Sequence, residues 1–265
     1  MLIRQTTDID SLRRFWDKRP LLYIYELGDL APAWSRWCSF WGGFEDGRLV
    51  VAALQYNKFD TPVLLLLAPG INDTLCQFAA ELAPHLPDRL YVHIHPDLVD
   101  SLPGFLPGDA TPALKMGLAD RTALPPAPAC ETLTSEHGPE VRALLDAAYP
   151  GHYFDEATLA TGVYRGIREG GELVAVGGVH VNAPEEGVAA LGNIGVRTDR
   201  RGHGLGRAVT LAVCHALPSE VRCIGLNVYA HNEAAIRIYQ RLGFVKVADY
   251  LETTLARVPA AAQTP

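Results

Sequence analysis

The chain has 265 residues, of which 48% are apolar and 20% are charged, and this composition excludes a disordered or fibrous protein. At about 100–200 residues per domain, the length allows one large domain or two ordinary ones, each able to bury a core. Thirty acidic and 23 basic residues give a net charge of −7. We therefore expect no binding to nucleic acid or to anionic membranes, and a small molecule or a protein as the partner.

The cysteines and the N-terminal residues indicate the compartment. The five cysteines form no CxxC pair, and the histidines do not combine with them at metal-ligand spacing, so we expect no bound metal. The N-terminal sequence MLIRQTTDID has no apolar stretch of the signal-peptide type, and the longest apolar run, at 63–68, is too short to cross a bilayer. These features predict a cytoplasmic protein with no membrane partner.

Apolar periodicity predicts the elements of the first half in chain order. We expect a helix at 8–16, two strands of a hairpin within 39–56, a strand at 62–68, a helix at about 73–83, and strands at 89–96 and 113–118. The segment ALPPAPAC at 123–130 follows, and its prolines exclude a helix or a central strand. This segment is the expected linker between two domains.

The second half repeats this order of elements. We expect a helix at 135–148, strands at 162–168, 172–181 and 188–196, a helix at 203–217, a strand at 222–228, a helix at 232–241 and strands at 244–250 and 251–257. The predicted fold class is α/β, with a mixed sheet flanked by helices in each of two tandem domains. The expected division is a first domain at 1–122, a linker at 123–130, a second domain at 131–255 and an unpatterned tail at 256–265.

The most informative segment is the glycine-rich stretch 193–207, where a strand runs through a turn into a helix. Gly204 and Gly206 fall in the expected first helical turn, where each glycine costs about 1 kcal/mol relative to alanine. Close approach of backbone N–H groups to a ligand explains that choice, and a helix N-terminus favours phosphate. The stretch also holds four arginines and a single acid, Asp199. The alternative is a tight glycine turn with solvated arginines.

Two named phosphate motifs are excluded here. No Lys or hydroxyl residue follows the glycines as a Walker loop requires. The third small residue of a Rossmann fingerprint is also missing, because Val209 stands in its place.

A second group of residues lies on the helix expected at 232–241. Asn232, Ala235 and Tyr239 are spaced i, i+3 and i+7, which places them on one stripe. The simpler alternatives are that Asn232 is only the helix N-cap and that Tyr239 is a half-buried aromatic residue.

Together the two segments resemble the GNAT acyltransferase superfamily over residues 131–255. The resemblance rests on Arg201-x-x-Gly204-x-Gly206 after a strand, Asn227-Val228, Asn232-x-x-Ala235-x-x-x-Tyr239 and Gly243-Phe244. Its best local match is to glycine N-acyltransferase-like domains, with Val196-Arg-Thr198 as the shared feature. The resemblance implies an acetyl-CoA-binding fold in which a strand splays from its neighbour, the pantetheine lies in the gap, and the pyrophosphate rests on the amides of the glycine turn.

By position, the resemblance also implies roles for individual residues. It implies backbone contacts from Val196 and Thr198, pyrophosphate contacts from Arg201, Gly202, His203, Gly204, Leu205 and Gly206, a pantetheine contact from Asn232, and protonation of the thiol by Tyr239. An amine would attack the thioester carbonyl directly, because no cysteine stands where a covalent acyl carrier is needed.

The sequence departs from the family pattern at the general base. Many relatives have a glutamate where this chain has Ala190, so we take His180 as the candidate base; the alternative is a histidine that only packs on a sheet face. His152 and Tyr153, in the loop at 149–154, are candidate contacts to the acceptor substrate, or else part of a hydrophobic staple.

The first half lacks an equivalent of the glycine turn. Residues 69–73 hold no arginine, one glycine and an acid, Asp73, so we expect a degenerate GNAT-like domain that has lost CoA binding. The leading hypothesis is an N-acetyltransferase acting on a small amine, an amino acid derivative or a peptide N-terminus. The alternatives are a non-catalytic CoA-binding sensor or scaffold, and an acyltransferase that uses longer acyl-CoA.

Overall fold

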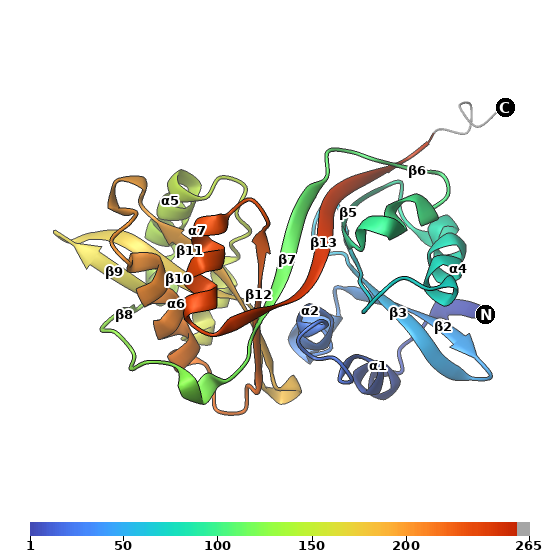
Figure 1. Cartoon of the computed structure of the whole chain (residues 1–265), viewed down its shortest axis with the longest axis horizontal. Helices are drawn as coiled ribbons and strands as arrows, with labels where there is room; N and C mark the ends of the chain where they lie inside the picture. Colours follow the sequence, from blue (N-terminus) through green and yellow to red (C-terminus); the bar gives the residue numbers. More distant parts are fainter. Residues whose placement is uncertain (259–265) are drawn as a thin grey trace. The chain divides into compact units, whose positions relative to one another are not determined.

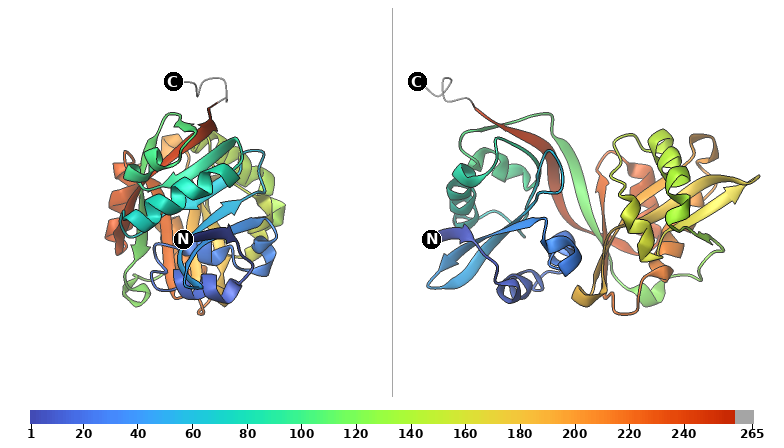
Figure 2. Two further views of the ribbon diagram at one scale, coloured as in Figure 1. Left: turned by 90° about the vertical axis from the view of Figure 1, so that its right-hand side faces the viewer. Right: turned by 180° about the vertical axis from the view of Figure 1, so that it is seen from behind.

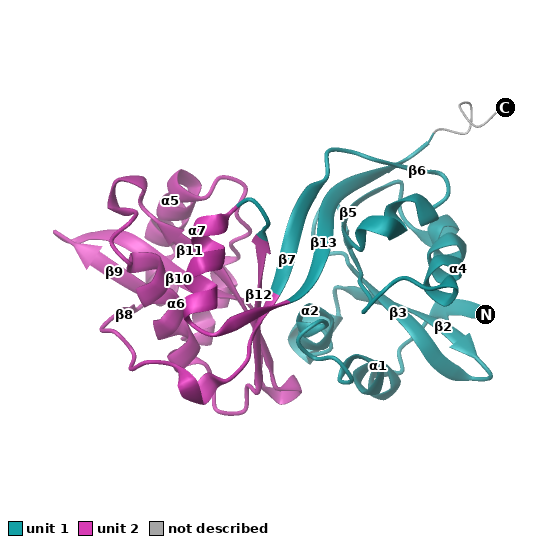
Figure 3. Ribbon diagram, viewed as in Figure 1, with its two compact units in different colours: residues 1–115, 229–231, 247–265 teal, residues 116–228, 232–246 magenta. Residues whose placement is uncertain are grey.

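The computed structural model describes residues 1–258, which form two compact units (Figure 3). Unit 1 comprises residues 1–115, 229–231 and 247–258, and unit 2 comprises residues 116–228 and 232–246. The expected linker at 123–130 therefore lies inside unit 2, and the last strand of the chain belongs largely to unit 1. The alternation of apolar and polar residues predicts the last strand, but it does not indicate which sheet the strand joins.

Unit 1 is built on a mixed sheet. Its elements are β1 (Leu2–Gln5), α1 (Ile9–Trp16), α2 (Ile24–Gly28), α3 (Pro32–Ser35), β2 (Cys38–Glu45), β3 (Arg48–Tyr56), β4 (Val63–Leu66), α4 (Asp73–Leu82), β5 (Arg89–Ile94), β6 (Phe105–Pro107), and the unit 1 parts of β7 (Thr111–Leu118) and β13 (Phe244–Arg257). The strands pair in the order β1-β2-β3-β4-β5-β13, and only β4 and β5 are parallel. Helix α4 makes the crossover between those two strands (Figure 1).

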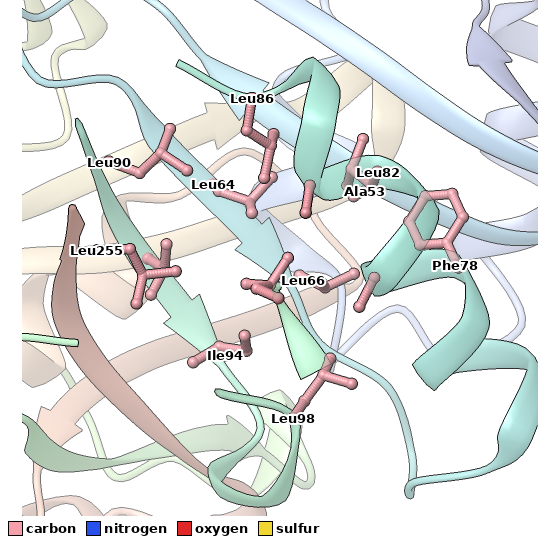
Figure 4. Packing of buried hydrophobic residues seen from close by; sticks show 14 of the residues in the cluster. Ala53, Leu64, Leu66, Phe78, Leu82, Leu86, Leu90, Ile94, Leu98 and Leu255 are labelled. Atoms are coloured by element: carbon pink, nitrogen blue, oxygen red, sulfur yellow. The ribbon is translucent and has the colours of Figure 1, made fainter. Parts of the chain in front are cut away.

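The core of unit 1 lies between α4 and the sheet (Figure 4). Leu75, Phe78, Ala79 and Leu82 are spaced i, i+3, i+4 and i+7, so α4 presents one apolar stripe to the strands. Asn72 caps this helix, because its side-chain oxygen accepts a hydrogen bond from the Leu75 amide at 2.9 Å. The strands supply alternate residues to this core, as expected of a sheet covered by a helix.

Unit 2 is also built on a mixed sheet in which a helix joins two parallel strands. Its elements are β8 (Glu131–Thr132), α5 (Gly138–Ala148), β9 (Arg165–Glu169), β10 (Glu172–Ala183), β11 (Val188–Val196), α6 (Leu205–Ala216), β12 (Cys223–Tyr229) up to residue 228, α7 (Glu233–Arg241), and residues 116–118 of β7 and 244–246 of β13. The strands pair in the order β12-β11-β10-β9-β8, and only β11 and β12 are parallel. Helix α6 is their crossover.

The helices of unit 2 cover both faces of its sheet, with α6 and α7 on one face and α5 on the other (Figures 1 and 2). Small residues let them approach closely. A Cβ added at Gly195 would lie 2.9 Å from Leu145 of α5, and one added at Gly177 would lie 3.3 Å from Val209 of α6. The part of β10 and β11 around Gly177 and Gly195 is therefore packed closely between α5 and α6.

The predicted mixed α/β architecture is confirmed, and the differences in detail have physical causes. The strands expected at 244–250 and 251–257 form a single strand, β13. Within residues 1–258, five α-helices and β-strands were not predicted, namely β1, α2, α3, β6 and β8, and each has five residues or fewer, too few for a period to show. Residues 124–130 form no helix or strand. Of the expected tail, Ala256 and Arg257 belong to β13, and residues 259–265 lie outside the described residues. In residues 1–258 no helix is long and apolar enough to span a membrane.

Candidate active site

The glycine-rich turn opens α6 without a side-chain cap. Gly202 and Gly204 have φ values of 82° and 80°, in the left-handed region that favours glycine. Gly204 is the N-cap of α6 and no side chain accepts a hydrogen bond from the first-turn amides, as far as residues 1–258 describe. A Cβ added at Gly206 would make only ordinary contacts, 3.6 Å from Val196 and Ile238. The described neighbours therefore do not require glycine at 206, whereas a ligand against the backbone would.

The arginines beside this turn are paired to a greater extent than the sequence indicated. Arg197 binds Glu172 at 2.6 Å and Asp199 at 2.7 Å, and Arg200 binds Glu169 at 2.7 Å and Asp199 at 2.9 Å. The pKa of Asp199 is lowered, first by the hydrogen bond from Arg197. Two of the four arginines are thus paired with acids, and local counting along the chain does not detect the two acids that come from other strands, Glu169 and Glu172.

Arg201 ties the turn to its surroundings. Its guanidinium donates to the carbonyl of Ala148, at the end of α5, at 2.7 Å and to the carbonyl of Val196 at 3.3 Å. The Nδ1 atom of His203 lies 2.9 Å from the carbonyl oxygen of Arg201. These contacts hold the backbone of the turn, and they leave the guanidinium charge of Arg201 without an acidic partner among the described residues, beside the uncapped amides of α6.

The two parallel strands beside the turn separate at the place where β11 approaches it. Their ladder runs from the pair Val188–Cys223 to the pair Leu191–Leu226 and extends no further in the described residues, although β11 continues to Val196. The opening agrees with the splayed strand that the resemblance implied. Thr198 lies just beyond it, in the short 3-10 turn Thr198–Arg200.

A bulge interrupts β11 within this opening. Gly178 pairs with Gly192 and Val176 with Gly195, so two residues of β11 face Gly177 alone. One of the two is Asn193, which is buried and has a φ of 53°. A left-handed asparagine in a strand is uncommon and needs support from its surroundings.

Tyr164 supplies that support. Its hydroxyl accepts a hydrogen bond from Asn193 Nδ2 at 2.9 Å and another from Thr158 Oγ1 at 2.9 Å, and donates to the Val179 carbonyl at 3.0 Å. Burial raises the pKa of this hydroxyl. A Cβ added at Gly178 would lie 2.1 Å from the ring, so the glycine makes room for Tyr164. Sequence reasoning missed this network; the only signals were the Gly-Gly pair in β10 and an asparagine within β11.

Helix α7 carries the other two predicted residues. Asn232 is the N-cap of α7, since its Oδ1 accepts from the Ala235 amide at 3.1 Å, as the simpler alternative predicted. Tyr239 is 7% exposed and packs against Phe244, with ring centroids 5.9 Å apart. Burial, and then the neighbouring Tyr149, raise the pKa of Tyr239. Its hydroxyl therefore keeps its proton at neutral pH.

The candidate base and part of the acceptor loop lie together. A Cβ added at Gly192 would lie 2.1 Å from the ring of His180, so the imidazole covers the strand next to the bulge. The ring of Tyr153 lies 6.1 Å from that of His180 between centroids, and Tyr153 is 46% exposed. Ala190 is buried and has no group that could act as a base.

His152 faces a different environment. Its Nε2 lies 2.8 Å from Asp146 Oδ1, and its side chain is only 5% exposed. The ring packs beside those of Tyr149 and Phe154, with centroids 6.5 and 6.4 Å away. These contacts favour the staple alternative for His152 over a contact with an acceptor.

The glycine turn, the unpaired end of β11 and α7 all lie within one segment that matches a known family. Residues 130–244 match the model of the acetyltransferase (GNAT) family. Residues 1–258 contain no group of three or more His, Cys, Asp or Glu side chains that could hold a metal ion.

The curated relatives that match this chain are mycothiol acetyltransferases. The chain is 33% identical over 115 residues to a mycothiol acetyltransferase of Paenarthrobacter aurescens, covering 42% of this chain and 34% of the relative. It is 33% identical over 144 residues to the mycothiol acetyltransferase of Streptomyces coelicolor, covering 51% of this chain and 45% of the relative. The chain thus spans less than half of the length of these relatives.

Solved structures extend the likeness of fold to nearly the whole chain. A GNAT-family acetyltransferase of Novosphingobium aromaticivorans has a TM-score of 0.62 at 22% identity, covering 91% of this chain and 100% of that chain. A tandem GNAT protein from the clavulanic acid biosynthesis pathway has a TM-score of 0.53 at 16% identity, covering 98% of this chain and 99% of that chain. At these identities the likeness concerns the fold alone.

Proposed function

We propose that unit 2 is an N-acetyltransferase that moves the acetyl group of acetyl-CoA to the primary amine of a small molecule or an amino acid derivative. One observation carries the proposal: a helix that begins on an uncapped left-handed glycine beside the opening between two parallel strands. The amides of that turn suit a pyrophosphate, and the opening suits an extended chain that needs backbone partners. The GNAT match over residues 130–244 supports the same activity.

The residues around the turn fit acetyl-CoA as the co-substrate. The pyrophosphate would lie against the backbone of residues 201–206, and Val196 and Thr198 would offer backbone contacts to the pantetheine arm. Asn232 would contact the pantetheine with its amide nitrogen, because its Oδ1 already caps α7. The paired arginines would steady the turn rather than bind phosphate with free charge.

The reaction is a direct transfer within a ternary complex. The amine nitrogen attacks the thioester carbonyl carbon, a C–N bond forms, and the C–S bond breaks as the tetrahedral intermediate collapses. Tyr239 would give its hydroxyl proton to the departing sulfur, because this buried phenol still carries its proton at neutral pH when the C–S bond breaks. The amine gives up one proton to a base, for which we propose His180, with Tyr153 beside it as a contact to the acceptor.

We also propose that unit 1 binds no CoA. Its crossover helix α4 occupies the place that α6 has in unit 2, yet Asn72 caps its amides and Asp73 lies in its first turn. A carboxylate and an occupied cap both disfavour a phosphate at this helix end. Unit 1 would be the degenerate copy of a duplicated fold.

Substitution of Tyr239 by Phe tests the proposed chemistry, because it removes the proton donor and keeps the ring. We expect kcat to fall by about 10²–10⁴, with little change in acetyl-CoA affinity, when thiol release is followed over a panel of amines. The panel should include the acceptor of the mycothiol acetyltransferases. Tyr56→Phe, in unit 1, is the matched control and should leave kcat unchanged.

Three results would contradict parts of this proposal. A change of less than about threefold in the single-turnover rate of Tyr239→Phe would remove its role as the acid. Binding of acetyl-CoA without turnover of any amine would indicate a sensor or scaffold. Faster transfer from longer thioesters than from acetyl-CoA would indicate an acyltransferase for longer chains.

A further inference from the structure

The strand pair β10–β11 contains a second bulge, and this one carries the candidate base. Val179 of β10 pairs with Leu191 of β11. The next pair along the two strands joins Val181 to Ala190, so β10 has one extra residue, His180, between these pairs. A bulge re-aims the side chain that it carries. The direction of the His180 imidazole therefore depends on how β10 is held at this point.

The bulge in β11 lies at the unpaired end of that strand. It contains Asn193, two residues beyond Leu191, where the ladder with β12 ends. The strand then continues to Val196, for which we propose a backbone contact to the pantetheine arm. Because the φ of 53° at Asn193 departs from the extended backbone, it sets the course of this last part of β11.

One buried hydroxyl group joins the two bulges. Tyr164 is 0% exposed, and its hydroxyl donates to the carbonyl oxygen of Val179 at 3.0 Å. That carbonyl belongs to the peptide group that leads into His180. The same hydroxyl accepts a hydrogen bond from Asn193 Nδ2 at 2.9 Å. A single oxygen atom thus connects the backbone before the candidate base to the bulged residue of β11.

The hydrogen-bond roles in this network follow from its chemistry. A carbonyl oxygen can only accept, so the Tyr164 proton is directed to Val179 and Asn193 must present its amide nitrogen. Asn193 Oδ1 is buried and has no partner among the described residues, so the bond to Tyr164 is the one side-chain hydrogen bond that holds Asn193 there. Thr158 Oγ1, 2.9 Å from the Tyr164 hydroxyl, fixes the hydroxyl from a third side.

We propose that Tyr164 is a positioning residue for acetyl transfer, whose hydroxyl keeps the bulge that carries His180 and the bulge at the opened end of β11 in one fixed relation. The inference rests on the proposed function, in which His180 takes a proton from the amine and β11 lies along the acyl-pantetheine. Tyr164 acts through Val179 and Asn193, and not by contact with the reacting atoms. When this connection is cut, each bulge can shift separately, and a displacement of about 1 Å can cost about 100-fold in rate.

The test is single-turnover kinetics of Tyr164→Phe in the full chain, with acetyl-CoA and three amine probes: ethanolamine, D-glucosamine and glycinamide. The temperature is one at which circular dichroism shows each variant to be folded. We expect the transfer rate to fall by roughly 10- to 100-fold. The Kd of acetyl-CoA in calorimetry should stay within about twofold of the wild type, because the glycine turn is unchanged.

Leu217→Ala is the matched control for a loss of stability. Leu217 is 3% exposed and lies at the end of α6 away from the glycine turn, so its truncation destabilises unit 2 without changing either bulge. We expect this variant to transfer acetyl groups at a rate within about twofold of the wild type at the same temperature. A role of Tyr164 in stability alone would give the same result for both variants.

Asn193→Gly is a second test that keeps the bond between Tyr164 and Val179. Glycine adopts the φ of 53° without strain, so the bulge can still form, but it is no longer held to Tyr164. We expect the transfer rate to fall by about threefold or more, with an unchanged Kd of acetyl-CoA. The double variant should be no slower than Tyr164→Phe alone, because both substitutions remove the same bond.

Three results would overturn the inference in a chain whose wild type transfers acetyl groups. They are a Tyr164→Phe rate within about threefold of the wild type, an equal loss of rate in Leu217→Ala, and a double variant that loses the product of the two single effects. If Tyr164→Phe does not fold, the rate of Asn193→Gly decides. A wild type that transfers acetyl to none of the probes would instead refute the proposed function, and this inference with it.

Discussion

Tyr164→Phe tests whether the bulge in β11 depends on one hydroxyl group. The phenylalanine ring would fill the same space over Gly178, so no cavity forms and only the hydrogen bonds change. Thr158 Oγ1 keeps another partner, the carbonyl of Asp155 at 2.6 Å. Asn193 Nδ2 loses its bond to Tyr164, and the Val179 carbonyl loses a donor.

The expected loss of stability follows from those two buried groups. An unsatisfied buried polar group costs about 1–3 kcal/mol, and the two costs are not fully additive. We therefore expect unfolding of unit 2 to become easier by about 2–4 kcal/mol. Asn193→Gly should lose less, because a φ of 53° suits glycine. Adding Tyr164→Phe to Asn193→Gly should cost less than it does in the wild type, because only the Val179 carbonyl then loses a partner.

Urea denaturation can separate the two units. The four tryptophans, Trp16, Trp34, Trp37 and Trp41, all belong to unit 1, so tryptophan fluorescence reports unit 1 alone while far-UV circular dichroism reports both units. Tyr164→Phe should shift the dichroism transition and leave the fluorescence transition in place. Tyr153→Phe, at an exposed tyrosine of the same unit, should change neither by more than about 0.5 kcal/mol. A Tyr164→Phe protein as stable as the Tyr153→Phe control would refute the reasoning.

Further predictions concern the co-substrate and pH. Gly204→Asp should weaken CoA binding by more than about tenfold in calorimetry, because its carboxylate would compete for the α6 amides, whereas Gly47→Asp, at another open left-handed glycine, should not. The same titration should give one CoA per chain, and two per chain would show that unit 1 also binds it. The pKa of His93 falls from 6.5 to about 4 on folding, so His93 contributes a loss of up to about 3 kcal/mol to the stability of unit 1 as pH drops from 6.5 to 4. Buried Glu26 and Asp29, whose pKa values are raised, act in the opposite direction, so the contribution of His93 is the difference between the wild type and His93→Gln. Tryptophan fluorescence should show a weaker fall of stability in His93→Gln, and the same pH dependence in both proteins would contradict the assignment to His93.

The sequence predicted those elements whose apolar period is long enough to recognise. Helix α4 has ten residues with one buried stripe, and α6 has twelve, whereas α2 has five and shows no period. The division of the chain was harder to predict, because the 14 residues of β13 alternate in the same way whichever sheet they join. Strand pairing depends on partners far away along the chain, such as Ile94 for Leu251.

In the candidate site, too, contacts between residues far apart along the chain could not be predicted. The turn at Gly204 could be predicted because glycines at a helix start are a local signal. The neutralisation of Arg197 by Glu172 could not, since 25 residues separate the two. The Tyr164–Asn193 bond joins residues 29 apart, and neither residue stands out by type or spacing. Sequence reasoning thus selected the groups that we propose to contact the co-substrate, and it missed the groups that support the bulged strand.

The two crossover helices show why fold alone does not decide function in this chain. In each unit a parallel strand pair is joined by a helix that packs on the sheet, and the helix dipole favours an anion at both N-termini. The two helix ends differ in their caps and in charge: Asn72 caps α4 with its own oxygen and Asp73 follows it, whereas in residues 1–258 no side chain caps α6 at Gly204 and its first turn holds no acid. Once a side chain caps such a helix end, the end no longer favours an anion, while the sheet and its core are unchanged. A duplicated fold can then keep one unit for acetyl-CoA and leave the other free of that requirement.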